Sequence, residues 1–358
     1  DMNLKKYKKL LIVGLIVSGF SLLLVGIFFL ILHGIGSGLV DGRARERFER
    51  GDLRYTQVSC FLSEDINLSA SRMRYLDADI ETALTTDSYG APDGARVFLS
   101  AYSSERNFHY AGKKGSADAV RTFCVGGDFF YFHPIQMSSG WYFTGDELME
   151  TGVILDENLA WQLFGALDVS GMSVEVGGIH CTVLGVTKGP EGKPEKKEYG
   201  SAPTAYIPYA LASRLSTEEI PVTRYEAVLP DPVDGYGMKL FRNTLNLKEG
   251  EYHYVENTNR YSALSVVKGL KNTKDRILRT DNIVYPYWEN AARLADNRAH
   301  YIGILLVIFI LPPILYLLFW IVLLFNRKEI LVKGAVHHVS DAYTTIRKKI
   351  RQKKEKKA

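Results

Sequence analysis

Two long stretches without charge, one near each end of the chain, constrain the fold more than any other feature. Residues 10–33 contain no charged side chain, with His33 at the edge, and residues 301–325 contain none. A helix of roughly 20 apolar residues crosses the hydrocarbon core of a bilayer. Both stretches reach that length, so we expect two transmembrane helices, at residues 10–33 and 301–325.

The charges that flank these stretches predict the orientation. Residues 1–9 carry four Lys and one Asp, and residues 327–358 carry eleven Lys or Arg and three acidic residues. Because basic flanks stay on the cytoplasmic side, we expect a protein of the cytoplasmic membrane with both termini in the cytoplasm. The basic tail could also bind anionic lipid, or it could be a topology signal only.

The first stretch could instead be a cleaved signal peptide. It is longer than a typical signal-peptide core, and no small-x-small cleavage site lies just before a polar stretch. We therefore expect it to be retained.

Residues 10–326 carry 29 basic and 36 acidic residues, a balance that argues against nucleic acid as a partner.

Small residues and prolines predict how the two spans pack. Gly14, Ser18 and Ser21 share one helix face, and small residues at such spacing let helices approach closely. The alternative is that glycine is simply common in membrane helices. Pro312 and Pro313 remove backbone donors at the centre of the second span, where we expect a kink or a helix–helix contact.

The region between the spans is too long for a linker and too apolar to be disordered. Ser69 is a predicted N-cap, followed by Met73, Leu76, Ile80 and Leu84 at helical spacing. Strands are predicted on both sides of this helix and further along the chain. The expected strands are 56–62, 96–102, 119–125, 204–208, 224–229 and 252–255, and a second helix is expected at 237–245.

The middle of this region has clear turn signals. We expect a strand at 152–155, an N-cap at Asp156, and a helix at 157–164 that ends at Gly165. Gly177 and Gly178 predict a tight hairpin between strands at 173–176 and 179–186. Composition predicts an exposed loop at 188–200, and a stalk helix is expected at 287–300.

An ordered series of short motifs resembles the periplasmic core domain of MacB-type ABC transporters. The series includes Val-Gly-Gly-Asp-Phe-Phe, Gly-Trp-Tyr-Phe, Gly-Val-Ile-Leu-Asp-Glu-Asn-Leu-Ala, Gly-Met-Ser-Val-Glu-Val-Gly-Gly and Val-Leu-Gly-Val, in that order between residues 125 and 186. The resemblance implies an α+β extracytoplasmic domain at residues 34–286, made of strand–helix–strand units with small mixed sheets.

The residues after the second span resemble the same position in FtsX-like permeases, where a cytoplasmic coupling helix docks on the ATPase. The resemblance implies an ATPase-coupling role, within a cytoplasmic segment at 326–358, for Arg327, Lys328, Glu329, Ile330, Gly334 and Ala335. FtsX-like permeases have four spans, whereas this sequence shows two. We therefore expect it to assemble with other permease subunits, as a hetero- or homo-oligomer.

The family implies a mechanical role, mechanotransmission or export, for a transmembrane subunit that couples a separate cytoplasmic ATPase to movement of the external domain. No G-x-x-x-x-G-K-[ST] motif is present. The main alternative is an accessory or scaffold subunit that binds a partner permease or an external protein without contacting the ATPase. The third hypothesis is a ligand sensor whose tail signals. We rank it last, because the sequence after the second span shows no kinase or other output domain.

The sequence offers no constellation typical of an enzyme. None of the eight His residues has metal-ligand spacing, and no G-x-S-x-G motif is present, so we expect no cofactor, no metal and no catalytic site. Cys60, Cys124 and Cys181 could form one disulfide, but buried free thiols are the favoured state. The aromatic residues 129–132 could form a substrate-facing patch, although core packing is favoured.

Overall fold

The computed structural model describes residues 4–48, 53–89, 96–143, 150–248, 250–271 and 283–355, with side chains in those ranges from Lys9 to Leu323 and at Phe325. The chain divides into two units. The membrane unit comprises Asp1–Leu30 with Ile302–Ala358, and the folded unit comprises Ile31–Tyr301.

The membrane unit is built from two long helices, α1 (Leu4–Ser37) and α10 (Tyr287–Glu355). Each contains a segment long and apolar enough to cross a bilayer, with a mean hydropathy of 2.8 in both. Within the unit the two helices are in contact: the rings of Phe28 and Phe309 lie 5.8 Å apart, and the Tyr316 hydroxyl donates to the carbonyl oxygen of Leu11 at 3.2 Å.

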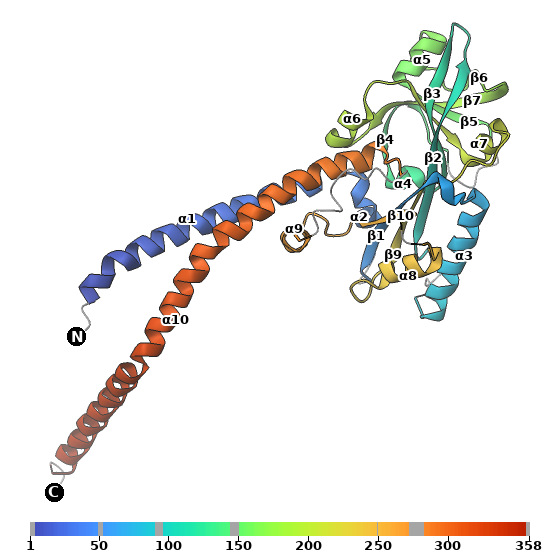
Figure 1. Cartoon of the computed structure of the whole chain (residues 1–358). Coiled ribbons are helices and arrows are strands. Elements are labelled where there is room, and N and C mark those ends of the chain that lie inside the picture. Colours follow the sequence, from blue (N-terminus) through green and yellow to red (C-terminus); the bar gives the residue numbers. More distant parts are fainter. Residues whose placement is uncertain are drawn as a thin grey trace. The chain divides into compact units, whose positions relative to one another are not determined.

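A mixed sheet forms the centre of the folded unit (Figure 1). Its strands run in the order β10-β1-β9-β2-β3-β8-β5-β7-β4, and β6 pairs with β2 and β7. The pairs β3/β8 and β5/β7 are parallel, and the other pairs are antiparallel. The strands are β1 (Tyr55–Leu62), β2 (Leu99–Ala111), β3 (Ser116–Gly127), β4 (Ile135–Gly140), β5 (Gly152–Asp156), β6 (Ser173–Val176), β7 (Ile179–Pro190), β8 (Thr204–Pro208), β9 (Arg224–Pro230) and β10 (Tyr252–Glu256).

Short helices cover the sheet and connect its strands. The helix α8 contacts β1 and β9, and α3 contacts α8 and β2. The helix α5 contacts β3, β5 and β7, and α7 contacts β3 and β8. Figure 1 shows α3 and α8 near one end of the sheet and α5 and α7 near the other. The helices of the folded unit, besides the first part of α10, are α2 (Ala44–Phe48), α3 (Ala70–Thr86), α4 (Phe129–Phe132), α5 (Glu157–Phe164), α6 (Lys193–Tyr199), α7 (Tyr209–Leu215), α8 (Tyr236–Leu245) and α9 (Ala263–Gly269), with 3₁₀ turns at Asp41–Arg43 and Glu64–Ile66.

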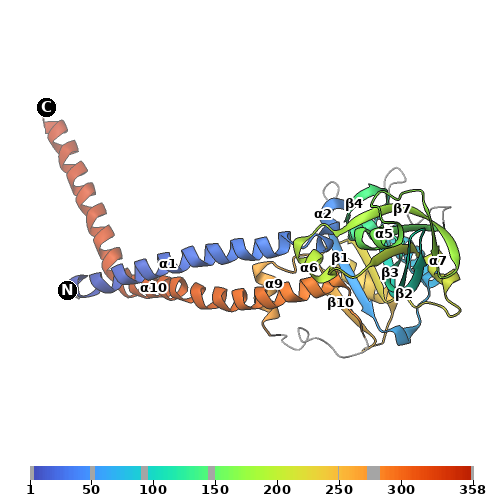
Figure 2. The same ribbon diagram turned by 90° about the horizontal axis from the view of Figure 1, so that it is seen from above.

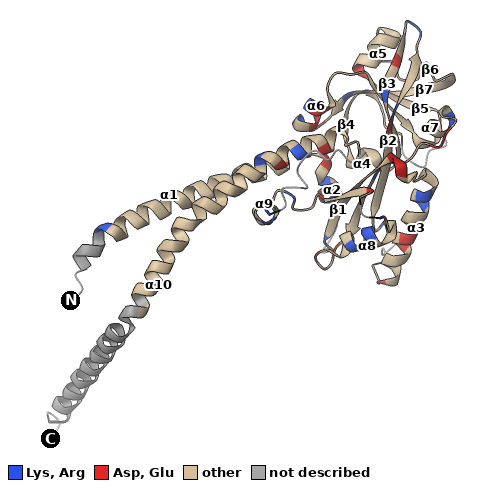
Figure 3. Ribbon diagram, viewed as in Figure 1, with Lys and Arg blue, Asp and Glu red and all other residues tan. Residues whose placement is uncertain are grey.

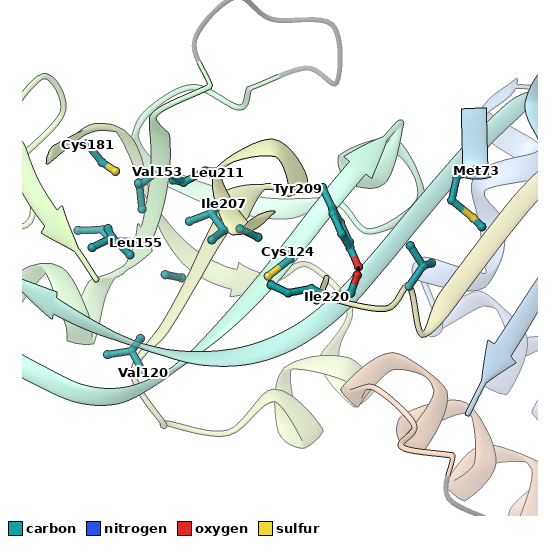
Figure 4. Packing of buried hydrophobic residues seen from close by; sticks show 14 of the residues in the cluster. Met73, Val120, Cys124, Val153, Leu155, Cys181, Ile207, Tyr209, Leu211 and Ile220 are labelled. Atoms are coloured by element: carbon teal, nitrogen blue, oxygen red, sulfur yellow. Dashed lines mark hydrogen bonds between the residues drawn. The ribbon is translucent and has the colours of Figure 1, made fainter. Parts of the chain in front are cut away.

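The main hydrophobic core lies between the sheet and these helices. Met73, Leu76, Ile80 and Leu84 of α3 are all buried, as their helical spacing predicts, and the Ser69 hydroxyl accepts from the backbone N–H of Arg72. Figure 4 shows part of this core around Val120, Cys124, Val153 and Ile207. The core is continuous across the sheet, so one packed interior supports both groups of helices.

The cysteines belong to this core. Cys60, Cys124 and Cys181 are free and buried, which confirms the favoured prediction of buried thiols. Burial raises the pKa of Cys124 to about 12 and that of Cys181 to about 11, because a thiolate is poorly solvated in an apolar interior. These thiols are therefore protonated and unreactive in the folded protein.

Local turn chemistry is confirmed where the sequence signals were strong. The Asp156 carboxylate accepts from the backbone N–H of Leu159 at 2.7 Å and caps α5, and Gly165 ends that helix with φ of 66°. Gly177 and Gly178 form the turn between β6 and β7, with φ of 52° and 87°. Positive φ favours glycine, which has no Cβ.

Three predictions of structure are corrected. The segment 188–200 is not an exposed loop, because β7 continues to Pro190 and α6 follows, with Glu195 and Tyr199 buried. The segment is rich in charged residues, and only two positions of the helix are buried, so its sequence shows no apolar helical pattern. The strand expected at 96–102 begins later and runs to Ala111, and the strand expected at 119–125 spans Ser116–Gly127, since these two strands pair over almost their whole length.

Candidate functional site

The first turn of α10 is buried in an aromatic cluster of the folded unit. Tyr287 is 4% exposed and Trp288 is 5% exposed, and the Trp288 ring lies 6.0 Å from that of Phe123 and 5.9 Å from that of Phe129. Phe129 and Phe132 are buried in the same cluster, so the aromatic residues 129–132 contribute to packing, as favoured. The start of α10 is therefore an integral part of the folded unit.

His133 lies at the centre of this junction and is completely buried. Its Nδ1 is 3.2 Å from Oδ1 of Asp41, and its Nε2 is hydrogen-bonded to Oε2 of Glu226. The Trp288 ring covers the imidazole, with 3.9 Å between ring centroids. The Ser59 hydroxyl donates to the other oxygen of Glu226 at 2.6 Å. We call Asp41, His133, Glu226 and Trp288 the His133 cluster.

The charges of this cluster keep His133 protonated. Burial alone lowers the pKa of an imidazole, but the negative charge of Glu226 and the hydrogen bonds to Asp41 and Glu226 outweigh it and raise the pKa of His133 to about 9. At neutral pH both ring nitrogens therefore carry protons and donate to carboxylates. Charge-assisted hydrogen bonds of this kind are stronger than neutral ones.

Asp41 also meets a second buried carboxyl group. Its backbone N–H donates to Oε1 of Glu195 at 3.5 Å, whereas Oδ2 of Asp41 and Oε2 of Glu195 have no hydrogen-bond partner among the described residues. Burial raises the pKa of Asp41. Burial, reinforced by the charge of Asp41, raises the pKa of Glu195 to about 7. Ionisation of both carboxyl groups of this pair is therefore unfavourable.

The segment that follows α1 is fixed at the same place. Nε2 of Gln57 on β1 donates to the carbonyl oxygen of Asp41 at 2.9 Å, and Nη2 of Arg47 on α2 donates to that of Tyr131 at 2.7 Å. Leu39 packs against Ala291, Ala292 and Ala295 of α10. Both chain segments that lead to the membrane helices are thus attached to the sheet around His133.

A second ionic group holds the stalk, residues 287–300 of α10, against the loop after β10. The guanidinium of Arg260 donates to Glu289 through two hydrogen bonds of 3.0 Å, and to Asp296 at 3.1 and 2.5 Å. Arg293 donates to Glu289 at 3.1 Å. Burial lowers the pKa of Arg260, but the charges of Glu289 and Asp296 outweigh it and raise that pKa well above its usual value. We call Arg260, Glu289, Arg293 and Asp296 the stalk clamp.

A family comparison decides the identity of the folded unit. The model of the MacB-like periplasmic core domain matches residues 21–235. The chain belongs to this family. It is a membrane protein with a MacB-like extracytoplasmic domain of the ABC transporter permease type, and the predicted α+β class and family resemblance are confirmed.

Solved structures share only low overall similarity with this MacB-like chain. No curated protein matches it. The extracellular domain of the noncanonical ABC-type transporter YknZ from Gram-positive bacteria is 15% identical, with a TM-score of 0.38 over 56% of this chain and 99% of that one. The periplasmic region of MacB from Actinobacillus actinomycetemcomitans is 16% identical, with a TM-score of 0.41 over 61% and 94%. A domain described as a permease protein from Porphyromonas gingivalis is 13% identical, with a TM-score of 0.33 over 58% and 92%.

The residues predicted for helix packing lie in the membrane unit of this MacB-like protein. A Cβ added to Gly14 would lie 2.7 Å from the Tyr316 ring, so only glycine fits there. Ser18 and Ser21 are buried, and Pro312 and Pro313 lie inside α10. The functional role of these five residues in helix packing stays a prediction.

The predicted coupling residues lie further along α10, whose backbone is helical through all of them. The side chains of Arg327, Lys328, Glu329, Ile330, Gly334 and Ala335 lie outside those described. None of the residues predicted for packing or coupling belongs to the His133 cluster or the stalk clamp.

No sequence pattern predicted the two ionic groups of the MacB-like domain. Asp41, Glu195 and Glu226 are isolated acidic residues far apart in the chain, and isolated acidic residues are usually exposed. His133 directly follows the aromatic residues 129–132. A lone histidine next to a core-forming segment was the one available signal of a buried, partnered imidazole.

Proposed function

We propose that this MacB-like protein couples a separate cytoplasmic ABC ATPase to movement of its extracytoplasmic domain. The observation that carries the proposal is the continuity of α10. This helix runs without interruption from Tyr287 to Glu355, so one element contains both Trp288 of the His133 cluster and the predicted coupling residue Arg327. A helix can transmit displacement along its axis, because backbone hydrogen bonds connect successive turns. In α10 this ladder lacks the two donors that Pro312 and Pro313 remove, so we expect the helix to be most compliant there.

The contacts that hold the N-terminal end of α10 to the folded unit support the proposal. The Trp288 ring lies against a buried imidazolium, which is hydrogen-bonded to Glu226 on β9, and the stalk clamp holds the next two turns. A displacement of the stalk would therefore move the sheet, since breaking buried ion pairs is costly. The energy would come from ATP hydrolysed by another polypeptide.

The topology proposed with this function has a cytoplasmic segment at residues 1–9, spans at 10–33 and 301–325, a MacB-like domain at 34–286, a stalk at 287–300 and a cytoplasmic coupling segment at 326–358. The proposed partners are the ABC ATPase, further permease subunits and the lipid bilayer. The output would be export or mechanotransmission.

The test is co-purification of the tagged full-length chain from its native membranes in a gentle detergent. We expect an ABC ATPase subunit in the complex and a loss of that subunit, or of its stimulated ATP hydrolysis, in the charge-reversal variants Arg327→Glu and Glu329→Arg. Arg347→Glu and Lys349→Glu in the basic tail are matched controls. A wild-type complex without an ATPase would overturn the proposal. Full activity of the Arg327 and Glu329 variants would favour the scaffold alternative.

A further inference from the structure

The helix α9 has one face turned toward the stalk, and among the described residues nothing covers the opposite face. Val266 faces inward and is 7% exposed, whereas Leu264 is 65% exposed. Residues three or four apart share a helix face, so Leu264, Val267 and Lys268 lie on the same side of α9. This side presents the exposed Leu264 and Lys268, and the exposed Lys271 lies two residues beyond the end of the helix.

Contacts within the folded unit fix the level of α9 along the stalk. Ser265, Val266 and Gly269 line one cavity of about 300 Å³ together with Ala299 and His300. The Tyr261 hydroxyl, just before α9, donates to the carbonyl oxygen of Ala292 at 2.9 Å. Figures 1 and 2 both show α9 beside this part of α10. The helix therefore lies level with the last stalk turn, directly before the apolar stretch that begins at Tyr301.

The stalk itself has the composition of a membrane boundary at this level. Arg298 is exposed, and Tyr301 is 68% exposed. Tyrosine is enriched where a membrane helix meets water, and Lys or Arg side chains extend their charged ends toward the interface. Figure 3 marks basic residues on α9 and on the stalk. The surroundings of α9 thus have the composition that is typical of a membrane–water boundary.

We propose that α9 is an interfacial anchor that lies on the outer surface of the same membrane the chain spans. Leu264 enters the boundary between headgroups and acyl chains, and Lys268 and Lys271 contact the phosphates of anionic phospholipids. An exposed aliphatic side chain with one lysine on the same helix face and a second lysine just after the helix is suited to this position. Because the inner face of α9 is joined to the stalk, the lipid surface supports the stalk clamp from outside.

The test uses the full-length chain in nanodiscs, labelled at one introduced cysteine with an environment-sensitive NBD fluorophore. The native cysteines are buried, so labelling is selective for Leu264→Cys or for the control Val233→Cys, an exposed position between β9 and α8. We expect a blue-shifted emission at position 264, and stronger quenching by lipids with a spin label near the headgroup than by lipids with the label at the chain end. At position 233 we expect neither effect.

A charge arm identifies the lipid contact. In nanodiscs of phosphatidylcholine with phosphatidylglycerol, Lys268→Glu should reduce the quenching at position 264, while Lys239→Glu on the exposed face of α8 should not. Equal emission and equal quenching at positions 264 and 233 would overturn the proposal. A blue shift without lipid quenching would also overturn it, because protein rather than lipid would then cover Leu264.

Discussion

The residues around His133 show how a buried charge can be fully compensated while its neighbours are not. The imidazolium donates to two carboxylates and is covered by an indole ring. Asp41 and Glu195 each keep one buried oxygen without a hydrogen-bond partner among the described residues, and such groups are expensive to bury. The most informative single substitutions therefore concern Glu195 and Trp288.

Glu195→Gln should stabilise the protein at pH 8 by about 1–3 kcal/mol, because a pKa shift of one unit is worth 1.36 kcal/mol. The folded pKa of Glu195 is about 7, above its usual 4.5, so the folded state binds the proton more tightly. The free energy of unfolding therefore falls as pH rises from about 4.5 to about 7. Thermal unfolding between pH 4.5 and 8 should show a shallower slope for the variant.

The control for that prediction is Glu218→Gln, since Glu218 is exposed. His133 adds a slope of the same sign at higher pH: its folded pKa of about 9 exceeds the usual 6.5, so its contribution is complete below pH 6.5 and is lost as pH rises through 9. An unchanged pH dependence in Glu195→Gln would show that Glu195 is ionised without cost in the folded protein.

Trp288→Ala should destabilise the folded unit by about 3–5 kcal/mol, the usual range for removing a large buried aromatic side chain. The substitution removes the ring that covers His133 and opens a space next to Phe129. Trp161→Ala is the matched control, since Trp161 is 62% exposed, and it should change stability by less than about 0.5 kcal/mol. Equal effects of both variants in differential scanning fluorimetry would contradict this ranking.

At the scale of elements, the sequence predicts well what local chemistry determines. The cap at Asp156, the end of α5 at Gly165 and the Gly177–Gly178 turn each depend on neighbours in the chain. The His133 cluster depends on residues separated by 92 or more positions, and the pairing of β1 with β9 and β10 also joins distant parts of the chain, so no local pattern contains them. The helix α6 was not predicted for a related reason. Its inward side consists of Glu195 and Tyr199, which do not form an apolar pattern.

The stalk clamp is the element contact that we expect to respond most strongly to one substitution. Arg260→Met leaves Glu289 buried at 3% exposure of its side chain with one cationic partner fewer, so the stability should fall by about 3 kcal/mol. Hydrogen exchange should accelerate in residues 257–271 and in the first turns of the stalk. The substitution Glu289→Gln in the same chain should recover part of the loss.

Arg43→Met is the control for the clamp, because the Arg43–Glu46 pair is exposed at 41% and 45% of the two side chains. Exposed pairs contribute about 0–1 kcal/mol. If Arg260→Met and Arg43→Met had the same small effect on hydrogen exchange, the stalk would be held by apolar packing alone.

At the scale of the whole molecule, the proposed orientation makes a direct prediction. A membrane-impermeant maleimide added to intact cells should label Val233→Cys, an exposed site at 71%, and should label Lys353→Cys in the basic tail only after the cells are opened. The buried native cysteines keep the background low, and the basic flanks supply the physical reason for the orientation. The reverse labelling pattern would invert the topology.

The chain leaves and rejoins its membrane helices at one place in the folded unit, where Leu39 touches Ala291 and where Asp41 and Trp288 meet at the same imidazole. The segment from β1 to β10 therefore begins and ends at neighbouring places in the folded unit. Such a segment could be exchanged as a unit. A chimera that retains Leu39, Asp41 and the start of α10 could receive the corresponding segment of a relative, provided that this segment carries equivalents of His133 and Glu226. Diversification of the folded unit would then leave the two membrane helices and the proposed coupling segment unchanged.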